Sequence, residues 1–326
     1  MVDSISKTPV PREVAAAIVT DAFGPDAALA AFTECTEGWF NAVHRLDLAD
    51  GRSCILKVAP PAAVRVLTYE HDIITTEVEA LRLVRERTTV PVPEVLWWDD
   101  TGRRIPSPLF LMERIDGTLL SELRITMSDT DQAAVDAQLA GFLAQLHTIT
   151  APTFGRPDPA ATRADRWSVA FRRLVADLLA DGTAAGVELP ASTADLLALV
   201  DRSAAALDEV TVPHLVHWDL WDPNVFVDPG TATVLGVVDF ERVLWADPLL
   251  EAQFLGRRAD DTVTDAYGTP LFTTPGAATR RRLYDLYLFL VMTIESAYRH
   301  YTTDDIEQMG RGGLAMTLAE IEESPA

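Results

Sequence analysis

Residues near the start of the chain alternate between apolar and polar, a pattern typical of β-strands with one buried face. Residues 43–48 and 53–58 both alternate in this way, and Asp50-Gly51 between them supplies turn residues. The pattern predicts three antiparallel strands between residues 31 and 58, with a hairpin at Asp50-Gly51.

A helical spacing follows these strands. Apolar residues recur three and four positions apart over residues 70–87, at Ile73, Ile74, Val78, Leu81 and Val84. Pro91 and Pro93 end this helix, because proline has no backbone N–H to continue it. Two further short strands are predicted at residues 94–98 and 109–112, and Gly117 permits a turn after them.

Beyond Gly117 the chain becomes rich in alanine and leucine. Amphipathic helices are predicted over residues 132–148, 164–181, 192–209, 280–302 and 303–323, with a β-rich interruption at 215–240. Ser192 or Thr193 can cap the third of these helices. A strand-rich part followed by a helix-rich part predicts a bilobal α+β fold. We divide it into a small β-rich lobe with one main helix, residues 1–113, and a larger helical lobe, residues 114–326.

Composition excludes several classes of protein. With 326 residues, 48% apolar and 23% charged, the chain has the profile of an ordinary globular protein. It shows no membrane-spanning run and no secretory signal, which predicts a cytoplasmic location. Two cysteines, Cys35 and Cys54, are too few for a zinc site or a disulfide framework. The net charge of −22 disfavours binding to nucleic acid.

Polar residues between short apolar runs mark a candidate catalytic region. His217, Asp219 and Asn224 follow one run, and Asp239 and Glu241 follow a later one. Asp219 can accept a proton from a hydroxyl, while Asn224 and Asp239 offer the hard oxygen ligands that Mg²⁺ prefers. The spacing of the first three residues is that of the kinase catalytic loop. The sequence therefore predicts phosphoryl transfer to a hydroxyl.

Two other interpretations fit part of this pattern, a capping turn and a metal-dependent hydrolase. The spacing of His217, Asp219 and Asn224 alone also fits a turn in which side chains cap backbone amides, but the second motif at residues 239–241 favours catalysis. A zinc or di-metal hydrolase would need further histidine ligands that the pattern lacks. No G-x-x-x-x-G-K-[ST] sequence occurs, which excludes a P-loop enzyme.

The same residues resemble the aminoglycoside phosphotransferase family, small-molecule kinases with a protein-kinase-like fold. Residues 239–241, Asp-Phe-Glu, are similar to the family's D-[WF]-E motif, and residues 246–248, Ala-Asp-Pro, to its G-D-P segment. The resemblance implies ATP and Mg²⁺ as cofactors. It implies Asp219 as the base, His217 as support for the loop backbone, and Asn224 and Asp239 as metal ligands.

Lys57 provides an independent indication in the first lobe. It lies in an apolar strand, where a charge is costly without a partner. The resemblance implies that Lys57 contacts the α- and β-phosphates and pairs with Glu77, rather than Glu79, of the following helix. The alternative is a solvated lysine at a sheet edge. The chain holds only one other lysine, Lys7, against 25 arginines, which favours a dedicated role.

The resemblance also implies the remaining nucleotide contacts. Gly38 to Asn41 is similar to the family's short segment over the phosphates, although Asn41 is alternatively a hairpin-turn residue. The end of the strand at 109–112 resembles the interlobe hinge, with a plain strand and turn as the alternative. There the Glu113 carbonyl and the Ile115 N–H pair with adenine, and Met112 lies behind the purine.

The acceptor is the least determined part. Trp218 stands where the family usually has glycine, and it either shapes the acceptor pocket or packs beneath the loop. Acidic residues outnumber basic ones where relatives place the acceptor; they are Glu241, Asp247, Glu251, Asp260, Asp261 and Asp265. This favours a cationic, aminoglycoside-like antibiotic. The alternatives are a neutral or zwitterionic acceptor (macrolide, peptide antibiotic, sugar or amino alcohol) or a non-catalytic nucleotide-binding pseudoenzyme.

Overall fold

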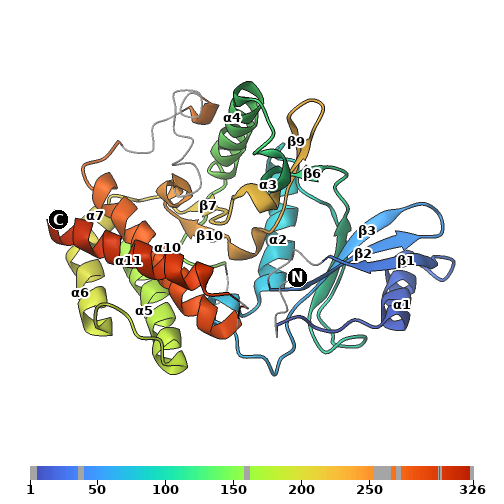
Figure 1. The fold of residues 1–326 in the computed structure, drawn as a ribbon, viewed down its shortest axis with the longest axis horizontal. Coiled ribbons are helices and arrows are strands. Elements are labelled where there is room, and N and C mark those ends of the chain that lie inside the picture. Colours follow the sequence, from blue (N-terminus) through green and yellow to red (C-terminus); the bar gives the residue numbers. More distant parts are fainter. Residues whose placement is uncertain are drawn as a thin grey trace.

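A five-stranded antiparallel sheet forms one end of the molecule (Figure 1). The computed structural model describes residues 6–35, 40–157, 162–252, 266–268, 273–299, 301 and 303–323. The sheet contains, in spatial order, β1 (Leu29–Glu34), β2 (Ala42–Leu48), β3 (Ser53–Val58), β5 (Leu109–Glu113) and β4 (Val95–Asp99). The three strands predicted between residues 31 and 58 are confirmed.

The two faces of this sheet pack against different helices. Because successive side chains of a strand point to opposite faces, Cys54, Leu56 and Val58 of β3 join the hydrophobic cluster of α1 (Arg12–Phe23). Ile55 lies on the other face, against the cluster that contains α2 (Ile73–Arg87). Helix α1 was not predicted, since its N-cap position is a proline without a side-chain cap.

Helix α2 begins later than the predicted residue 70. Residues Thr68–Glu70 form a 3₁₀ turn, η1, and the Glu70 carboxylate accepts the Leu67 amide at 2.8 Å. Asp72 then adopts a left-handed backbone with φ of 58°, which separates the 3₁₀ turn from the α-helix that begins at Ile73. Residues 68–72 therefore form a separate connector between β3 and α2.

Helices dominate the second part of the chain. They are α3 (Leu120–Leu123), α4 (Asp129–Leu146), α5 (Trp167–Ala185), α6 (Thr193–Arg202), α7 (Ala204–Leu207), α10 (Ala277–Arg299) and α11 (Asp305–Glu323). Ser192 caps α6 by accepting the Asp195 amide, as predicted. The prediction of a single helix over residues 192–209 was wrong, because α6 and α7 are separated at Ser203. The Ser203 hydroxyl donates to the Leu199 carbonyl at 3.0 Å.

Two small sheets lie between these helices. Strand β7 (His214–Val216) pairs with β10 (Leu244–Ala246), and β8 (Val225–Asp228) pairs with β6 (Thr118–Leu119) and β9 (Thr233–Val237). In β9, a Cβ on Gly236 would lie 2.0 Å from Cδ1 of Ile115. The missing side chain thus lets the connection between the lobes pack directly on β9.

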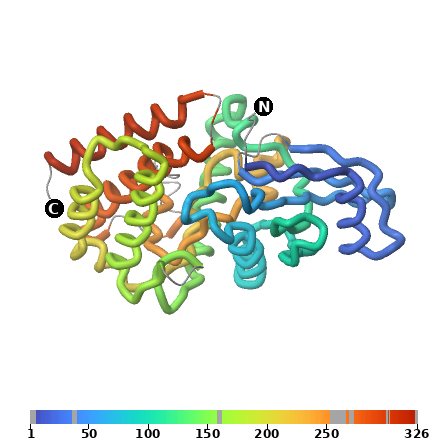
Figure 2. The backbone as a smooth tube through the Cα atoms, turned by 90° about the horizontal axis from the view of Figure 1, so that it is seen from below, coloured from blue at the N-terminus to red at the C-terminus, as the bar shows by residue number. Residues whose placement is uncertain are grey.

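The β-rich and helical parts lie at opposite ends of the molecule (Figure 2). One hydrophobic cluster continues between them: it joins Phe110 of the large sheet and Val78 of α2 to Leu139 of α4 and Val225 of β8. Strand β5 ends at Glu113, where we divide the chain, and that division stays a prediction. Among the described residues, none of the helices combines the length and apolar character needed to cross a bilayer.

Candidate active site

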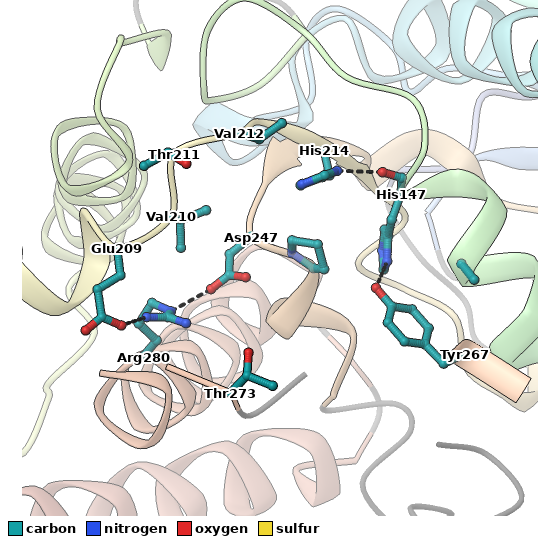
Figure 3. A pocket seen from close by; sticks show the side chains of 12 residues that line it. His147, Glu209, Val210, Thr211, Val212, His214, Asp247, Tyr267, Thr273 and Arg280 are labelled. Carbon is teal, nitrogen blue, oxygen red and sulfur yellow. Dashed lines mark hydrogen bonds and ion pairs between the residues drawn. The ribbon is translucent and has the colours of Figure 1, made fainter. Parts of the chain in front are cut away.

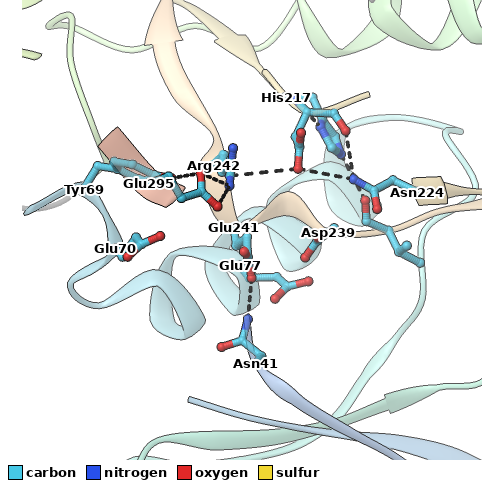
Figure 4. Close-up of polar contacts among 12 residues, drawn as sticks. Asn41, Tyr69, Glu70, Glu77, His217, Asn224, Asp239, Glu241, Arg242 and Glu295 are labelled. Atoms are coloured by element: carbon cyan, nitrogen blue, oxygen red, sulfur yellow. Dashed lines mark hydrogen bonds and ion pairs between the residues drawn. The ribbon is translucent and has the colours of Figure 1, made fainter. Parts of the chain in front are cut away.

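Lys57 lies at the centre of a cluster of carboxylates, of which Glu77 and Glu241 are buried and Asp239 is half-buried. Its Nζ is 2.7 Å from Oε2 of Glu77 and 2.9 Å from Oε2 of Glu241, and it also pairs with Oδ1 of Asp239. Asn41 adds a fifth group by donating from Nδ2 to Glu241 Oε2 at 2.5 Å. Strand β3, helix α2, the residues after β9 and the segment before β2 each contribute to this cluster. Figure 4 shows its members Glu77, Asp239, Glu241 and Asn41.

Burial and Lys57 act on these carboxylates in opposite directions. Burial raises the pKa of Glu77 to about 8, against the pull of the nearby Lys57. Burial also opposes ionisation of Asp239, but the Lys57 ammonium outweighs it and lowers that pKa. Oxygen atoms of Glu77, Asp239 and Glu241 lie within 4.8 Å of one another. The cation among them is the Lys57 ammonium, and Asp239 is the member whose pKa is lowered.

The segment after β7 forms a tight loop around His217 and Asp219. The His217 Nδ1 accepts the backbone N–H of Asp219 at 3.2 Å, and its Nε2 donates to the Val238 carbonyl at 3.1 Å. Burial lowers the pKa of His217 to about 4, so the ring is neutral near pH 7. His217 thereby ties the loop to the end of β9, next to Asp239, which agrees with the supporting role implied by the sequence.

Asp219 and Asn224 face each other across this loop. Asn224 Nδ2 donates to the Asp219 carbonyl at 2.8 Å and to its Oδ2 at 3.4 Å. Burial raises the pKa of Asp219 to about 8, opposed mainly by Arg242, whose Nε is 4.0 Å from Oδ2. Both side-chain contacts use Oδ2. A buried carboxyl of raised pKa suits a group that takes up a proton near neutral pH.

The comparisons with known proteins agree with this arrangement. Residues 31–286 match the family model described as the phosphotransferase enzyme family, APH. The chain belongs to this family. An aminoglycoside 3'-phosphotransferase of Streptomyces fradiae is 31% identical over 193 residues, which are 59% of this chain and 65% of that enzyme. The chain spans only 23% and 25% of the length of relatives from Aspergillus fumigatus and Arabidopsis thaliana.

Solved structures of phosphotransferases share the fold of the chain. A candidate fructosamine-3-kinase from Thermobifida fusca has a TM-score of 0.65 at 22% identity, covering 93% of this chain and 98% of that one. The aminoglycoside phosphotransferase APH(4)-Ia, in a ternary complex with AMP-PNP and hygromycin B, has a TM-score of 0.61 at 17% identity. That match covers 94% of this chain and 97% of the other. The bilobal protein-kinase-like α+β fold is thus confirmed.

Trp218, the departure from the usual glycine of the APH family, has a left-handed backbone with φ of 56°. Its indole is buried and stacks on Tyr287 with ring centroids 5.0 Å apart. Glu251 stabilises this turn, because its Oε1 accepts the backbone N–H groups of His217 at 2.5 Å and Trp218 at 3.1 Å. Of the two roles open for Trp218, the structure shows packing beneath the loop.

Glu251 has a second consequence, for the pH dependence of stability. Burial raises its pKa to about 7, against the backbone hydrogen bonds that lower it. Because the folded state holds this proton more tightly than the unfolded state, Glu251 makes folding less favourable as pH rises from about 4 to 7. We expect Glu251→Gln to gain about 2 kcal/mol relative to wild type between pH 5 and pH 8 in urea unfolding.

Glu209→Gln is the matched control for that prediction. Hydrogen bonds from Thr274 and Arg280 lower the pKa of Glu209, so its contribution to stability is present at high pH and lost on acidification. The difference between Glu209→Gln and wild type should therefore change with pH in the opposite direction. Parallel pH profiles for the two variants would contradict the role assigned to burial of Glu251.

Asp247, another predicted acceptor residue, also has partners inside the helical lobe. Its Oδ2 accepts Arg280 Nε at 2.8 Å and the Tyr284 hydroxyl at 2.7 Å. Asp247 also borders a pocket of about 470 Å³ (Figure 3). This pocket is lined by His214, at the start of β7, whereas the catalytic loop follows the other end of that strand. The contacts of Asp247 and Glu251 thus stabilise the helical lobe. Gly38, Asp260, Asp261 and Asp265 lie outside the described residues.

The predicted hinge residues lie where the sheet meets the helical lobe. Met112 is buried in β5, between Ile55 and Val95 of the neighbouring strands. Glu113 is exposed and its N–H donates to the Glu94 carbonyl at 2.8 Å. Ile115 packs on β9. Their contacts with adenine stay a prediction.

Sequence reasoning missed an ionic network beside Asp219. Arg242 Nη2 is 3.1 Å from Oε2 of Glu295, which also accepts the Tyr69 hydroxyl at 3.1 Å. Arg299 continues the network to Glu295 and Glu70. These groups come from the connector before α2, the 3₁₀ turn Phe240–Arg242 and helix α10, so no local spacing in the sequence joins them.

Proposed function

We propose that the protein is an ATP- and Mg²⁺-dependent kinase that transfers the γ-phosphoryl group to a hydroxyl of a small molecule. The observation that carries the proposal is the meeting of Lys57, Asp239, Asn224 and Asp219 from three separate segments: strand β3, the residues after β9 and the loop after β7. Membership of the phosphotransferase family supports it. A cytoplasmic location remains part of the prediction.

The residues present fit a magnesium ion. Asn224 commits its Nδ2 to Asp219, which leaves Oδ1 as its ligand atom, and Asp239 is ionised next to it. Both are hard oxygen donors. Asn224 and Asp239 would hold the Mg²⁺, which would supply neutralisation of the phosphate charge. Lys57 would hold the α- and β-phosphates, oriented by Glu77, and Asp219 would take the proton from the acceptor hydroxyl.

For the acceptor, we propose a hydroxylated, amine-bearing natural product of the aminoglycoside type. The similarity to the Streptomyces fradiae enzyme supports this class. Charge supports it too, because the four carboxylates of Asp219, Asp239, Glu241 and Glu295 outnumber the three cations paired with them, Lys57, Arg242 and Arg299. Asp247 and Glu251 no longer contribute, since both have intramolecular partners.

The test is ATP consumption with mass spectrometry of products over a panel of acceptors. The panel contains kanamycin, hygromycin B, a fructosamine, a macrolide and an amino alcohol, and Asp219→Ala serves as the inactive control. No phosphorylated product together with no Mg·ATP binding would leave the fold without the proposed activity. Binding of the nucleotide without phosphorylation of any panel member and without consumption of ATP would favour the pseudoenzyme alternative.

A salt series tests the charge argument. We expect the apparent KM of the best aminoglycoside to rise severalfold between about 0.02 M and 0.3 M salt at fixed Mg·ATP, because salt screens exposed charges. The N-acetylated form of the same acceptor is the matched control and should show a higher KM with little salt dependence. Equal turnover of both forms, unaffected by salt, would direct the search to neutral alcohols.

A further inference from the structure

Arg299, the last residue of α10, is a buried cation at the junction of the two lobes. Its Nη2 pairs with Glu70, and its Nε donates to Glu295 Oε1 at 3.1 Å. Only 3% of the residue is exposed. Glu70 belongs to the connector before α2, the helix that carries Glu77. A side chain of the helical lobe thus binds the connector that leads into α2, a helix of the β-rich lobe.

The same guanidinium also contacts Phe40, in the segment before β2 that carries Asn41. Its carbon atom lies 3.8 Å from the centroid of the Phe40 ring, which is itself buried. A cation over an aromatic face is attracted by the ring, and more strongly when the contact is desolvated. Phe40 directly precedes Asn41, which donates to Glu241, a partner of Lys57. Residues 40 and 41 are therefore held by α10 on one side and by the Lys57 cluster on the other.

Arg280, nearer the other end of α10, shows what a purely structural arginine does here. It is also buried and also has two carboxylate partners, Glu209 at 2.6 Å and Asp247 at 2.8 Å. Both partners belong to the helical lobe. Arg299 differs from Arg280 in that its contacts with Glu70 and Phe40 reach the β-rich lobe.

We propose that Arg299 is a positioning residue for the nucleotide: it fixes Phe40, and through it Asn41, in the place from which Asn41 contributes to nucleotide binding. This inference rests on the proposed nucleotide-binding function. The end of α10 then serves both substrates, since Glu295, one turn before Arg299, holds Arg242 beside Asp219. Nucleotide affinity should accordingly depend on a helix that lies in the other lobe.

The experiment is isothermal titration of the full chain with Mg·ATP, which requires no acceptor. Arg299→Met should weaken binding about tenfold, as should Phe40→Leu, which removes the aromatic face but keeps an apolar side chain. The double variant should bind no more weakly than Phe40→Leu alone, because both changes remove the same contact. Arg299→Lys keeps the charge without the flat guanidinium and should be intermediate; it replaces Arg299→Met in the cycle if the latter does not fold.

Arg280→Met is the matched control from the same helix. It should lower the melting temperature, as Arg299→Met should, and leave the affinity for Mg·ATP unchanged. Equal loss of affinity in both variants, or additive losses for Arg299 and Phe40, would mean that these residues only stabilise the fold and would overturn the proposal. Wild-type affinity in Arg299→Met would overturn it as well. Absence of binding by the wild type would instead refute the proposed function, a result separate from any of these.

Discussion

Replacement of Asp219 by alanine should lower turnover by a factor of about 10² to 10⁴, the usual cost of losing a general base. The reason is the position of its carboxylate. Asn224 and Arg242 both approach Oδ2, and among the described residues no hydrogen bond or ion pair uses Oδ1. Oδ1 is therefore the atom that can accept the proton of the acceptor hydroxyl.

Binding of the nucleotide should survive this substitution. Lys57 and Asp239, the groups expected to hold the phosphates and the metal, make no direct contact with Asp219 in the ion pairs described. Titration with Mg·ATP should give an affinity within about threefold of wild type, while product formation with the best acceptor falls. The two measurements together separate loss of the base from loss of the fold.

Asp222→Asn is the control from the same loop. Asp222 pairs with Arg124 at 2.6 Å, which anchors the loop to helix α4 through Asp136. We expect this variant to lose some stability and to keep most of its turnover. Comparable losses of turnover in Asp222→Asn and Asp219→Ala would show that loop geometry, rather than proton transfer, limits the reaction, and would remove the assigned role from Asp219.

The sequence predicted those parts of the fold that rest on local patterns. Alternation identified β2 and β3, and the serine cap identified the start of α6, because each depends on residues a few positions apart. The pairing of Lys57 with Glu77 was implied by the resemblance to the phosphotransferase family, because the phase of the matching helix pattern selects one of two glutamates. Helix α1 escaped detection because it begins at a proline and lacks a side-chain cap.

The remaining differences arise from contacts between distant segments. Glu251 and Asp247 belong to an acidic stretch, and the sequence does not show that backbone amides and Arg280 use those charges inside the lobe. Arg299 and Glu70 are separated by 229 positions along the chain. Net charge therefore overstated how acidic the acceptor side is, and the network at the end of α10 became visible only in three dimensions.

Replacement of Lys57 by methionine should produce the largest loss of stability, about 3 to 5 kcal/mol near pH 8. It leaves the buried Glu77 and Glu241 and the half-buried Asp239 within 4.8 Å of one another without a cation. Like charges so close raise each other's pKa, so the folded state takes up protons that the unfolded state releases. Stability must then fall as pH rises, and the loss should be smaller near pH 5 than at pH 8.

Asp239→Asn should have the opposite combination of effects: little change in stability and a large loss of nucleotide binding. Three carboxylates share one ammonium, so the loss of one leaves Lys57 paired with Glu77 and Glu241 and reduces the repulsion between them. We expect stability within about 1 kcal/mol of wild type, because the cation keeps its partners. Binding of ATP that depends on Mg²⁺ should nevertheless be lost, since the metal and the triphosphate bind together.

Urea unfolding at pH 5 and pH 8, with titration of Mg·ATP into each folded variant, distinguishes these effects. Lys7→Met is the control for Lys57, because the Lys7 ammonium pairs with a half-exposed Glu34 at 3.6 Å and its loss should cost less than about 1 kcal/mol. A pH-independent loss in Lys57→Met would contradict the view that the buried carboxylates need this cation. Retention of Mg²⁺-dependent binding in Asp239→Asn would move the metal away from Asp239, to ligands other than the pair that the sequence motif indicates.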